Sequence, residues 1–237
     1  MSESGVKIDG STVFVTGANR GLGRAVARAL TERGAATVYA GVRDPSSVTD
    51  PDLIPVQLDT TDPAAVAAAA ARCGDTTLLI NNAGISRPGS ITAATTLDTA
   101  RDEMETNYFG TLRMSQAFAP ILAANGGGAL VNVLSVLAWA SLPSVPAYCA
   151  SKSAAWSLTN GLRLALREQG TLVVGVHASF IDTDMAARVD VPKSSPADVA
   201  TAILDAVESG APEVFADDLT RRARAALSSN TLGVPVR

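Results

Sequence analysis

Three side chains in the second half of the chain are of types that can move a proton together. Tyr148 and Lys152 are four residues apart at the start of a segment with helical periodicity, which places both on one face of a helix. An ammonium group near a phenol favours the phenolate, so Lys152 is expected to lower the pKa of Tyr148 from its ordinary value of about 10. A tyrosine of that kind can exchange a proton near neutral pH.

Ser135 favours proton transfer by Tyr148 and Lys152 over a purely structural role for the pair. By themselves, Tyr148 and Lys152 would be an ordinary pair on a helix surface. Ser135 directly follows a β-branched run, and the loop between it and Tyr148 can fold its hydroxyl back toward the phenol. A serine, a tyrosine and a lysine at the carboxyl edge of a nucleotide-binding sheet suit carbonyl reduction or alcohol oxidation.

A glycine-rich segment near the start of the chain could approach a phosphate group. Gly17, Gly21 and Gly23 are spaced Gly-x-x-x-Gly-x-Gly between a predicted strand and a predicted helix. Glycine lets the backbone come close to a pyrophosphate, and the N-terminus of the following helix offers free N–H groups. An ordinary glycine turn is the alternative. The place directly after the first strand favours the dinucleotide interpretation.

The second predicted strand bears on the choice of dinucleotide. A free ribose 2′-hydroxyl calls for an acidic side chain after this strand, but Val42 stands there. Arg43 and Arg20 could instead hold a 2′-phosphate through charge-assisted hydrogen bonds. Both could also be solvated surface arginines, and Asp44 could partly neutralise Arg43. We predict NADP(H) as the preferred cofactor over NAD(H).

Polar residues also follow the third and fourth predicted strands. Asp59 follows the third, and Asn81-Asn82-Ala83-Gly84 ends the fourth. Open α/β sheets bind ligands at the carboxyl ends of their parallel strands. Taken singly, each could be a capping or turn residue.

The elements that must position these residues alternate along the chain. Short β-branched runs predict strands over 11–16, 37–42, 54–58, 77–81, 129–134, 172–176 and 213–216. Longer alanine-rich runs predict helices over 21–33, 62–72, about 97–123, 147–167, 196–209 and 219–227. This alternation predicts an α/β fold: a single-domain, Rossmann-type, doubly wound parallel sheet of about seven strands with helices on both faces, over residues 1–237.

Composition excludes several other classes. The chain has 237 residues with 19 Lys+Arg against 23 Asp+Glu, and no strongly basic run, which argues against nucleic acid as a partner. The sequence has no apolar stretch long enough to predict a membrane span, and its start lacks the apolar core of a signal peptide. Two cysteines and one histidine argue against a disulfide framework and a metal site. We expect a reducing, cytoplasmic location.

Taken together, the motifs resemble the short-chain dehydrogenase/reductase family, of the compact one-domain, classical kind. The resemblance covers roughly residues 8–216. Each motif alone is weak, but their joint occurrence in the expected order is highly specific. The motifs are Thr16-Gly17-x-x-x-Gly21-x-Gly23, Asp59, Asn81-Asn82-Ala83-Gly84, Asn107, Ser135 and Tyr148-x-x-x-Lys152.

The resemblance implies a role for each matching residue. Tyr148 would protonate the carbonyl oxygen, Ser135 would hydrogen-bond that oxygen, and Lys152 would also hold the nicotinamide ribose. Asn107 would kink its helix and hold a water joining Lys152 to solvent, and Asp59 would bind the adenine amino group. The implied cofactor-binding residues are Gly17, Asn19, Arg20, Gly21, Leu22, Gly23, Arg43, Asp59, Asn81, Ala83, Gly84, Tyr148, Lys152, Ile181 and Thr183.

One segment departs from the family pattern. After the sixth strand the family usually has Pro-Gly, where this chain has Ala178-Ser179. Thr183 remains and would bond the nicotinamide carboxamide. The change leaves the backbone against the nicotinamide less defined, but it removes no proton-transfer group. We interpret the preceding His177 as a strand-end residue and not as a catalyst.

The expected substrate pocket is apolar and partly aromatic. Its residues are Ile85, Leu137, Trp139, Leu142, Val145, Cys149, Phe180 and Met185. Some could simply be core residues. No Lys or Arg is among them, although Arg87 could approach from its loop, so we favour a neutral, apolar ketone, aldehyde or secondary alcohol. Residues of about 183–196 would form a short substrate lid.

Three functions are compatible with these observations. The first is an NADP(H)-dependent carbonyl reductase or alcohol dehydrogenase acting on a small molecule. The second is a dinucleotide-binding regulator without turnover, whose expected signature is loss of Tyr148 or Lys152; both are present. The third is isomerase or dehydratase chemistry on the same fold. The resemblance also implies a homo-oligomer, a tetramer or dimer built on the long helices that carry Asn107 and Tyr148.

Overall fold

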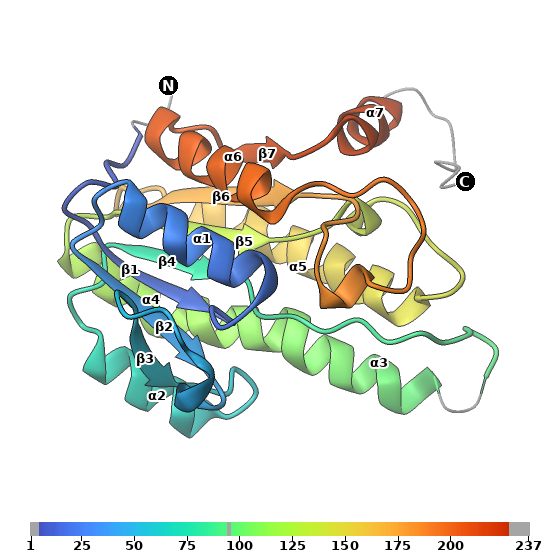
Figure 1. Ribbon diagram of the computed structural model, residues 1–237, viewed down its shortest axis with the longest axis horizontal. Helices are drawn as coiled ribbons and strands as arrows, with labels where there is room; N and C mark the ends of the chain where they lie inside the picture. The colour runs from blue at the N-terminus through green and yellow to red at the C-terminus, as the bar shows by residue number, and fades with distance from the viewer. Residues whose placement is uncertain (1–4, 94–95, 228–237) are drawn as a thin grey trace.

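A single parallel sheet of seven strands forms the centre of the molecule (Figure 1). The computed structural model describes residues 5–93 and 96–227. The strand order is β3-β2-β1-β4-β5-β6-β7, which confirms the predicted fold class. The strands are β1 (Thr12–Thr16), β2 (Thr37–Val42), β3 (Ile54–Gln57), β4 (Leu78–Asn81), β5 (Ala129–Val133), β6 (Leu172–His177) and β7 (Glu213–Phe215).

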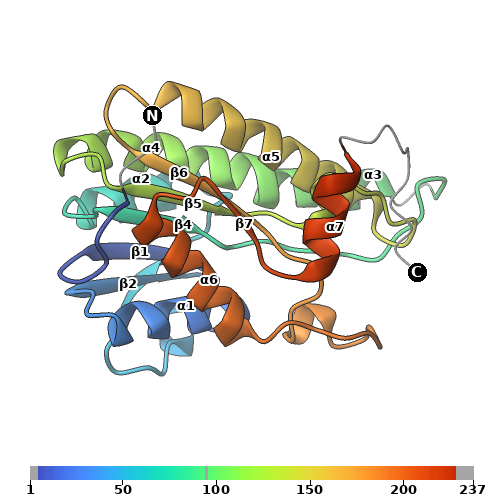
Figure 2. The same cartoon turned by 90° about the horizontal axis from the view of Figure 1, so that it is seen from above.

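Helices cover both faces of this sheet. Figure 2 shows α1 and α6 on one side, and α2, α4 and α5 on the other. The helices are α1 (Gly21–Glu32), α2 (Pro63–Arg72), α3 (Thr96–Met104), α4 (Thr111–Ala124), α5 (Pro146–Ala165), α6 (Pro196–Ser209) and α7 (Asp218–Ala226). Among the helices of the described residues, none is both long and apolar enough to cross a bilayer.

Two hydrophobic cores lie on the two faces of the sheet. Successive strand residues point to opposite faces, so Val13 and Val15 join the core under α1 and α6. Phe14, between them, joins the core under α2 and α4, where it packs against Phe118. The strands are therefore apolar on both sides, as expected for a parallel sheet covered by helices.

The helix predicted over 97–123 is not continuous. The structure divides it into α3, a π-helical segment η2 (Glu105–Gly110), and α4. Asn107 lies in the π-helical segment, and its side chain bonds the backbone of Ile85 on the neighbouring loop. Single π-helical turns inside α-helices frequently occur at functional sites.

Strand direction gathers the polar residues at one end of the molecule. The chain reverses its winding direction between the neighbouring strands β1 and β4, a topological switch point of the kind at which open α/β sheets bind ligands. The glycine-rich turn follows β1, Asn82 follows β4, and Ser135 follows β5. The site predicted from the sequence therefore lies where the topology places ligands.

Candidate functional site

Ser135 begins a short helical turn just beyond β5. It is the N-cap of η3 (Val136–Ala138), and its side-chain oxygen accepts a hydrogen bond from the Leu137 N–H at 3.1 Å. This bond uses an oxygen lone pair and leaves the hydroxyl proton free to donate. Tyr148, in the first turn of α5, makes a hydrogen bond with the Ser135 side chain that acts to lower the pKa of the phenol. The loop between the two residues thus brings them together as predicted.

Lys152 is held below this pair. Its Nζ donates to the Val133 carbonyl oxygen at 2.7 Å and lies 5.7 Å from the centroid of the Tyr148 ring. The side chain is only 5% exposed. Burial lowers the pKa of Lys152 to about 8, because the charged ammonium loses its hydration.

The expected lowering of the Tyr148 pKa is not what the structure gives. Burial raises the pKa of Tyr148 to about 12, and the hydrogen bond with Ser135 only partly opposes this. The expectation was wrong because it considered the lysine charge without the desolvation of the phenol. With its pKa lowered to about 8, Lys152 is still mostly protonated at pH 7, but it gives up its charge more readily than an exposed lysine. Tyr148 is therefore a phenol that retains its proton at neutral pH.

Asn107 joins three segments around Lys152. Its Oδ1 accepts from the Ile85 N–H at 2.8 Å, and its Nδ2 donates to the Ile85 carbonyl and to Ser151 Oγ, both at 2.9 Å. Gly84 leaves room for this arrangement, since a Cβ there would lie 3.1 Å from Asn107 Oδ1 and 3.6 Å from Lys152 Nζ. The π-helical segment, the loop after β4 and α5 thus meet at one point.

Glu103 is a residue of this region that the sequence interpretation missed. It lies one helical turn before Asn107, is fully buried, and accepts the Arg87 N–H at 2.7 Å through Oε1. Its Oε2 has no hydrogen-bond partner among the described residues. Burial raises the pKa of Glu103, and its negative charge in turn raises the pKa of Tyr148. Glu103 stands among other charged residues, between Asp102 and Glu105, so nothing in the sequence marked it as buried.

Replacing Glu103 by glutamine is expected to change how stability depends on pH. The folded protein holds the carboxyl proton to higher pH than the unfolded chain, so wild-type stability falls as pH rises from about 4.5 through the raised pKa. Each unit of pKa difference contributes about 1.4 kcal/mol. The Glu103→Gln variant keeps an acceptor for Arg87 but cannot ionise, so it gains stability relative to wild type as pH rises. Urea unfolding at pH 4.5 to 8 measures this.

The exposed Glu32→Gln substitution is the matched control, because it removes the same charge from the surface of α1. Its unfolding free energy should run parallel to wild type over the same pH range. Parallel curves for Glu103→Gln as well would show that the buried carboxyl is not linked to folding.

The backbone of the glycine-rich turn after β1 is closely packed. Gly17 has φ 68°, and a Cβ on Gly23 would lie 2.2 Å from the Gly17 carbonyl oxygen. Asn82, which was absent from the predicted cofactor-binding residues, holds the turn through bonds from Nδ2 to the carbonyls of Thr16 (2.9 Å) and Gly17 (3.3 Å). Thr16 Oγ1 accepts from the N–H groups of Asn82 and Ala83, both at 2.9 Å. This turn can approach a pyrophosphate without a side chain in the way.

Asn81 points away from this turn. Its Nδ2 donates to Asn132 Oδ1 at 2.9 Å and to Ser115 Oγ at 3.3 Å, inside the layer between the sheet and α4. Only the backbone of Asn81 can therefore contribute to a cofactor pocket.

Arg43 is exposed just past β2 and forms no hydrogen bond or ion pair within the described residues. Asp44 is engaged elsewhere, as the N-cap of η1 (Pro45–Ser47). Asp59 accepts from Thr61 N and Oγ1 at 2.9 and 2.7 Å, and these bonds, aided by the nearby charge of Arg43, lower its pKa. Arg43 and Asp59 thus lie near each other at the edge where β2 and β3 end.

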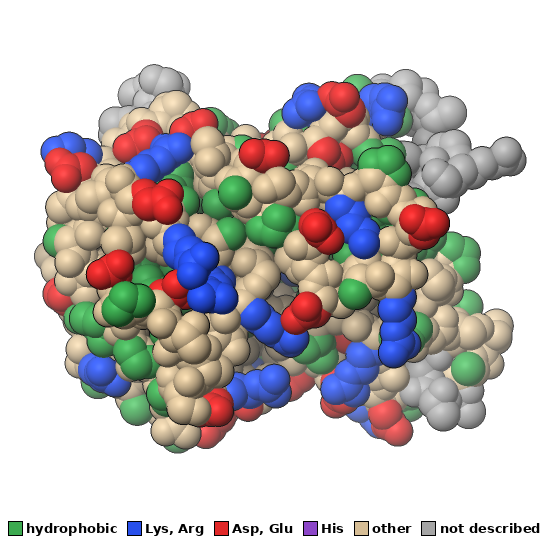
Figure 3. Space-filling view, viewed as in Figure 1, with side chains coloured by type: hydrophobic (Ala, Val, Ile, Leu, Met, Phe, Trp, Pro, Cys, Tyr) green, Lys and Arg blue, Asp and Glu red, His purple; other side chains and the backbone are tan. Residues whose placement is uncertain are grey.

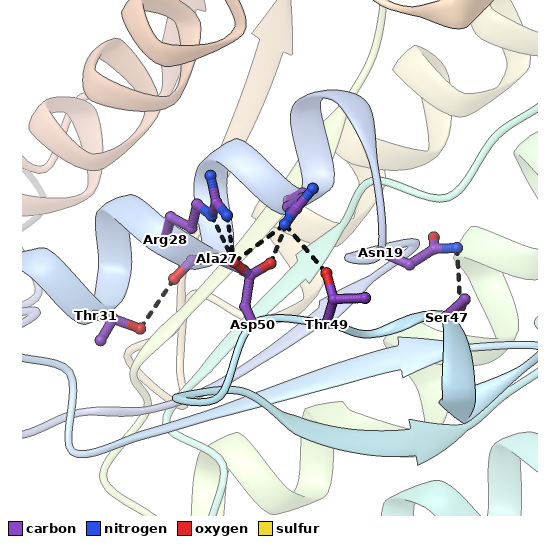
Figure 4. Close-up of polar contacts among 8 residues, drawn as sticks. Asn19, Ala27, Arg28, Thr31, Ser47, Thr49 and Asp50 are labelled. Atoms are coloured by element: carbon purple, nitrogen blue, oxygen red, sulfur yellow. Dashed lines mark hydrogen bonds and ion pairs between the residues drawn. The ribbon is translucent and has the colours of Figure 1, made fainter.

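The loop that carries Arg43 is pinned to α1 (Figure 4). The Asp50 carboxylate accepts hydrogen bonds from Arg24 Nε at 2.6 Å and from Arg28 Nε at 2.7 Å. Nearby, Asn19 Nδ2 donates to Ser47 Oγ at 3.1 Å. Figure 3 shows basic side chains across the middle of this face, many with acidic side chains beside them. These contacts fix the position of the loop relative to the glycine-rich turn.

The segment between β6 and α6 approaches the glycine-rich turn from the other side. Arg20 forms an ion pair with Asp184 at 3.0 Å, and a Cβ on Gly21 would lie 3.2 Å from Thr183 Cγ2. Ile181 pairs with Ser194 in an isolated bridge that closes the base of the predicted lid. Arg20 and Asp184 are both more than two-thirds exposed, so their attraction is weak and another anion can replace it.

Ala178-Ser179, in place of Pro-Gly, keeps ordered backbone contacts. The Ala178 carbonyl accepts the Val136 N–H at 2.9 Å, and the Ser179 N–H donates to Asp217 Oδ2 at 2.8 Å. Asp217 is also the N-cap of α7, so this helix is tied to the segment that precedes the lid. The sequence alone had given α7 no role.

The predicted substrate residues separate into two groups. Leu137, Cys149 and the partly buried Trp139, Leu142, Val145 and Tyr148 belong to one hydrophobic cluster, which Ala223 of α7 completes. Ile85, Phe180 and Met185 are not part of this cluster. Met185 is 55% exposed in the short turn η4 (Asp184–Ala186).

Comparison with known proteins identifies the family. The sequence profile described as short chain dehydrogenase matches residues 11–193. The short chain dehydrogenase mpl6 of Monascus purpureus is 31% identical over 231 residues, which cover 90% of this chain and 75% of that protein. A short chain dehydrogenase from Burkholderia cenocepacia J2315, solved in complex with NADP, is 44% identical with a TM-score of 0.91, covering 94% of this chain and 95% of that one.

A second solved structure is similar over much of the chain. The NADPH-bound carbonyl reductase from chicken fatty liver is 29% identical with a TM-score of 0.77, covering 88% of this chain and 89% of that one. The family profile, the relative and the solved structures agree with the motifs and with the sheet order. The chain therefore belongs to the short-chain dehydrogenase family.

Proposed function

We propose that this protein is an NADP(H)-dependent oxidoreductase that reduces a neutral, apolar ketone or aldehyde, or oxidises the corresponding secondary alcohol. The observation that carries the proposal is the meeting of Ser135, Tyr148 and Lys152 at the carboxyl ends of the strands, beside a turn shaped for a pyrophosphate. The 44% identical structure in complex with NADP supports the choice of cofactor.

The site residues divide the reaction between them. The bound dinucleotide would supply the hydride to the carbonyl carbon. Tyr148 gives its phenolic proton to the carbonyl oxygen, so that hydride and proton together complete the alcohol. Ser135 donates its free hydroxyl proton to the same oxygen and thereby orients the carbonyl. Lys152 lies beneath the phenol, where it can hold the nicotinamide ribose and assist the return of a proton to Tyr148.

The test is a turnover assay with NADPH or NADH and a panel of neutral ketones and aldehydes. Loss of absorbance of the reduced nicotinamide, with the alcohol found as product, supports the proposal. Tight binding of the dinucleotide with no turnover on any member of the panel would favour a regulator. Conversion of a substrate without net oxidation of the dinucleotide would favour isomerase or dehydratase chemistry.

Replacing Arg43 by alanine is expected to weaken the use of NADPH selectively. Arg43 is free to bind a 2′-phosphate, and a hydrogen bond to a charged group contributes about 1.5–3 kcal/mol. We expect kcat/KM with NADPH to fall about 10- to 100-fold, and kcat/KM with NADH to change by less than about 3-fold. Arg101→Ala, on the exposed side of α3, is the control. Equal losses with both cofactors would place Arg43 outside the 2′-phosphate site.

The proposal includes a homo-oligomer in the cytoplasm. Phe109 and Leu164 are large apolar side chains that remain exposed on the helical layer around η2 and α5. Such a surface supports burial against a second copy of the chain, either as a dimer or a tetramer. The free, buried cysteines Cys73 and Cys149 support a reducing compartment.

A further inference from the structure

His177 is a buried imidazole directly behind the catalytic serine. It is the last residue of β6, as predicted, and its side chain is fully buried. Its Nδ1 lies 3.3 Å from the carbonyl oxygen of Ser135. Its ring stacks on Trp139, with centroids 3.9 Å apart and an angle of 25° between the planes. The ring thus contacts the segment after β5 at two points.

The contact with Ser135 defines the tautomer of the ring. A proton on Nδ1 lets the ring donate to the Ser135 carbonyl, whereas a proton on Nε2 would set two lone pairs against each other at 3.3 Å. Nε2 has no hydrogen-bond partner among the described residues, and the nearest acid, Glu213 Oε1, is 3.9 Å away. The neutral imidazole with its proton on Nδ1 gives the Ser135 carbonyl a second donor, in addition to the Ala138 N–H at 3.1 Å.

Burial, aided by nearby positive charges, keeps the ring neutral. Burial lowers the pKa of His177 to about 4, and the positive charges of Arg224 on α7, and of Arg163 and Lys152 on α5, act in the same direction. Glu213 on β7 is the acidic group that faces the ring. His177 therefore keeps one protonation state across the neutral range, which suits a residue that positions another.

The segment that carries Ser135 is held on two sides. The Leu134 N–H donates to the Val176 carbonyl at 2.8 Å, and the Val136 N–H donates to the Ala178 carbonyl at 2.9 Å. Lys152 bonds the Val133 carbonyl, whereas the Ser135 carbonyl accepts the Ala138 N–H at 3.1 Å and also lies 3.3 Å from the ring nitrogen of His177. Among the described residues, the imidazole is the only side chain that hydrogen-bonds the Ser135 carbonyl.

We propose that His177 is a positioning residue for the reaction: its Nδ1–H adds a second hydrogen bond to the Ser135 carbonyl and so fixes the Ser135 hydroxyl beside Tyr148, where it can donate to the substrate carbonyl oxygen. This inference rests on the proposed function, because it assigns His177 a role that acts through Ser135. It also explains why a strand-end residue is packed against Trp139 and Phe215 with no access to solvent.

The first test needs no substitution. The chain has a single histidine, so nitrogen-15 NMR of the untagged protein reports one imidazole. We expect the Nδ1-protonated tautomer at pH 7 and no titration near the ordinary pKa of 6.5. An Nε2-protonated ring, or a ring that titrates near 6.5, would overturn the inference.

The second test separates positioning from packing. His177→Phe keeps an aromatic ring for Trp139 but has no donor, and His177→Asn places an amide N–H near the position of Nδ1–H. We expect His177→Phe to lower kcat about 3- to 10-fold, with the KM for the ketone and the cofactor Kd unchanged. His177→Asn should recover most of that loss. Equal losses in both variants would contradict the proposal.

A double-mutant cycle with Ser135→Ala completes the design. If His177 acts through Ser135, His177→Phe should have no further effect on kcat in the Ser135→Ala background. An additive loss would overturn the inference, and Tm and cofactor Kd are measured on every variant to detect misfolding. Full turnover by Ser135→Ala would contradict the proposed function and this inference with it. A large loss in Ser135→Ala with none in His177→Phe would contradict this inference alone.

Discussion

Replacing Tyr148 by phenylalanine is expected to lower kcat about 10²- to 10⁴-fold while leaving the cofactor Kd within about 3-fold, because a positioned general acid contributes a factor of that size. The phenol is the group that forms a hydrogen bond with Ser135 and lies over Lys152. Phenylalanine keeps the ring in the hydrophobic cluster around η3 and removes only the oxygen. Steady-state turnover and titration of the cofactor by fluorescence measure the two effects separately.

Tyr39→Phe is the matched control for this prediction. Tyr39 lies on β2, and its hydroxyl donates to Asp75 at 3.2 Å, outside the candidate site. Its variant should keep normal turnover. Normal turnover in Tyr148→Phe would mean that another group donates the proton, and the assignment of the acid would be wrong.

The raised pKa of Tyr148 also predicts how the two directions respond to pH. A pKa of about 12 means that the phenol keeps its proton through neutral pH, ready for carbonyl reduction. Alcohol oxidation must first remove this proton, so its rate should rise with pH while the rate of reduction changes little around neutrality.

Replacing Lys152 by methionine is expected to lower kcat by at least about 10²-fold and to weaken cofactor binding. Lys152 is the one ammonium group in contact range of the phenol within the described part of the chain, and its Nζ bonds the strand that leads to Ser135. Methionine preserves much of the buried stem but provides neither a proton nor a hydrogen-bond donor. Turnover at saturating substrate, with the cofactor Kd measured in parallel, tests both parts.

A stability measurement distinguishes the buried lysine from an ordinary one. The pKa of Lys152 is about 8 in the folded protein and close to 10.5 in the unfolded chain, so the unfolded chain binds more protons between these values. Wild-type stability should therefore rise with pH across that window, by on the order of 3 kcal/mol from this residue. The Lys152→Met variant should lack this rise, whereas the exposed Lys7→Met control should keep it.

If wild type and Lys152→Met changed stability in parallel above pH 8, Lys152 would not be buried as the structure shows. If Lys152→Met lacked the rise in stability but kept normal turnover, Lys152 would be buried as the structure shows but would have no catalytic role.

The elements with local signals were predicted closely. The strand over 37–42 and the helix over 196–209 have the bounds expected, because β-branched runs, an N-cap serine and a C-terminal glycine mark them within a few residues. The prediction of one continuous helix over 97–123 was wrong. Its π-helical segment depends on bonds between Asn107 and Ile85, which are 22 residues apart, and periodicity along the chain does not record such contacts.

The sequence by itself determined the order of strands and helices, the glycine-rich turn and the spacing that puts Tyr148 and Lys152 on one helix face, since these follow from neighbours in the chain. Only the tertiary structure decided how strongly the site is dehydrated. Burial raises the pKa of Tyr148 and lowers that of Lys152, and it places Glu103 and His177 next to the chemistry. These properties arise from groups that are distant in sequence and that together exclude water, a condition that no local pattern encodes.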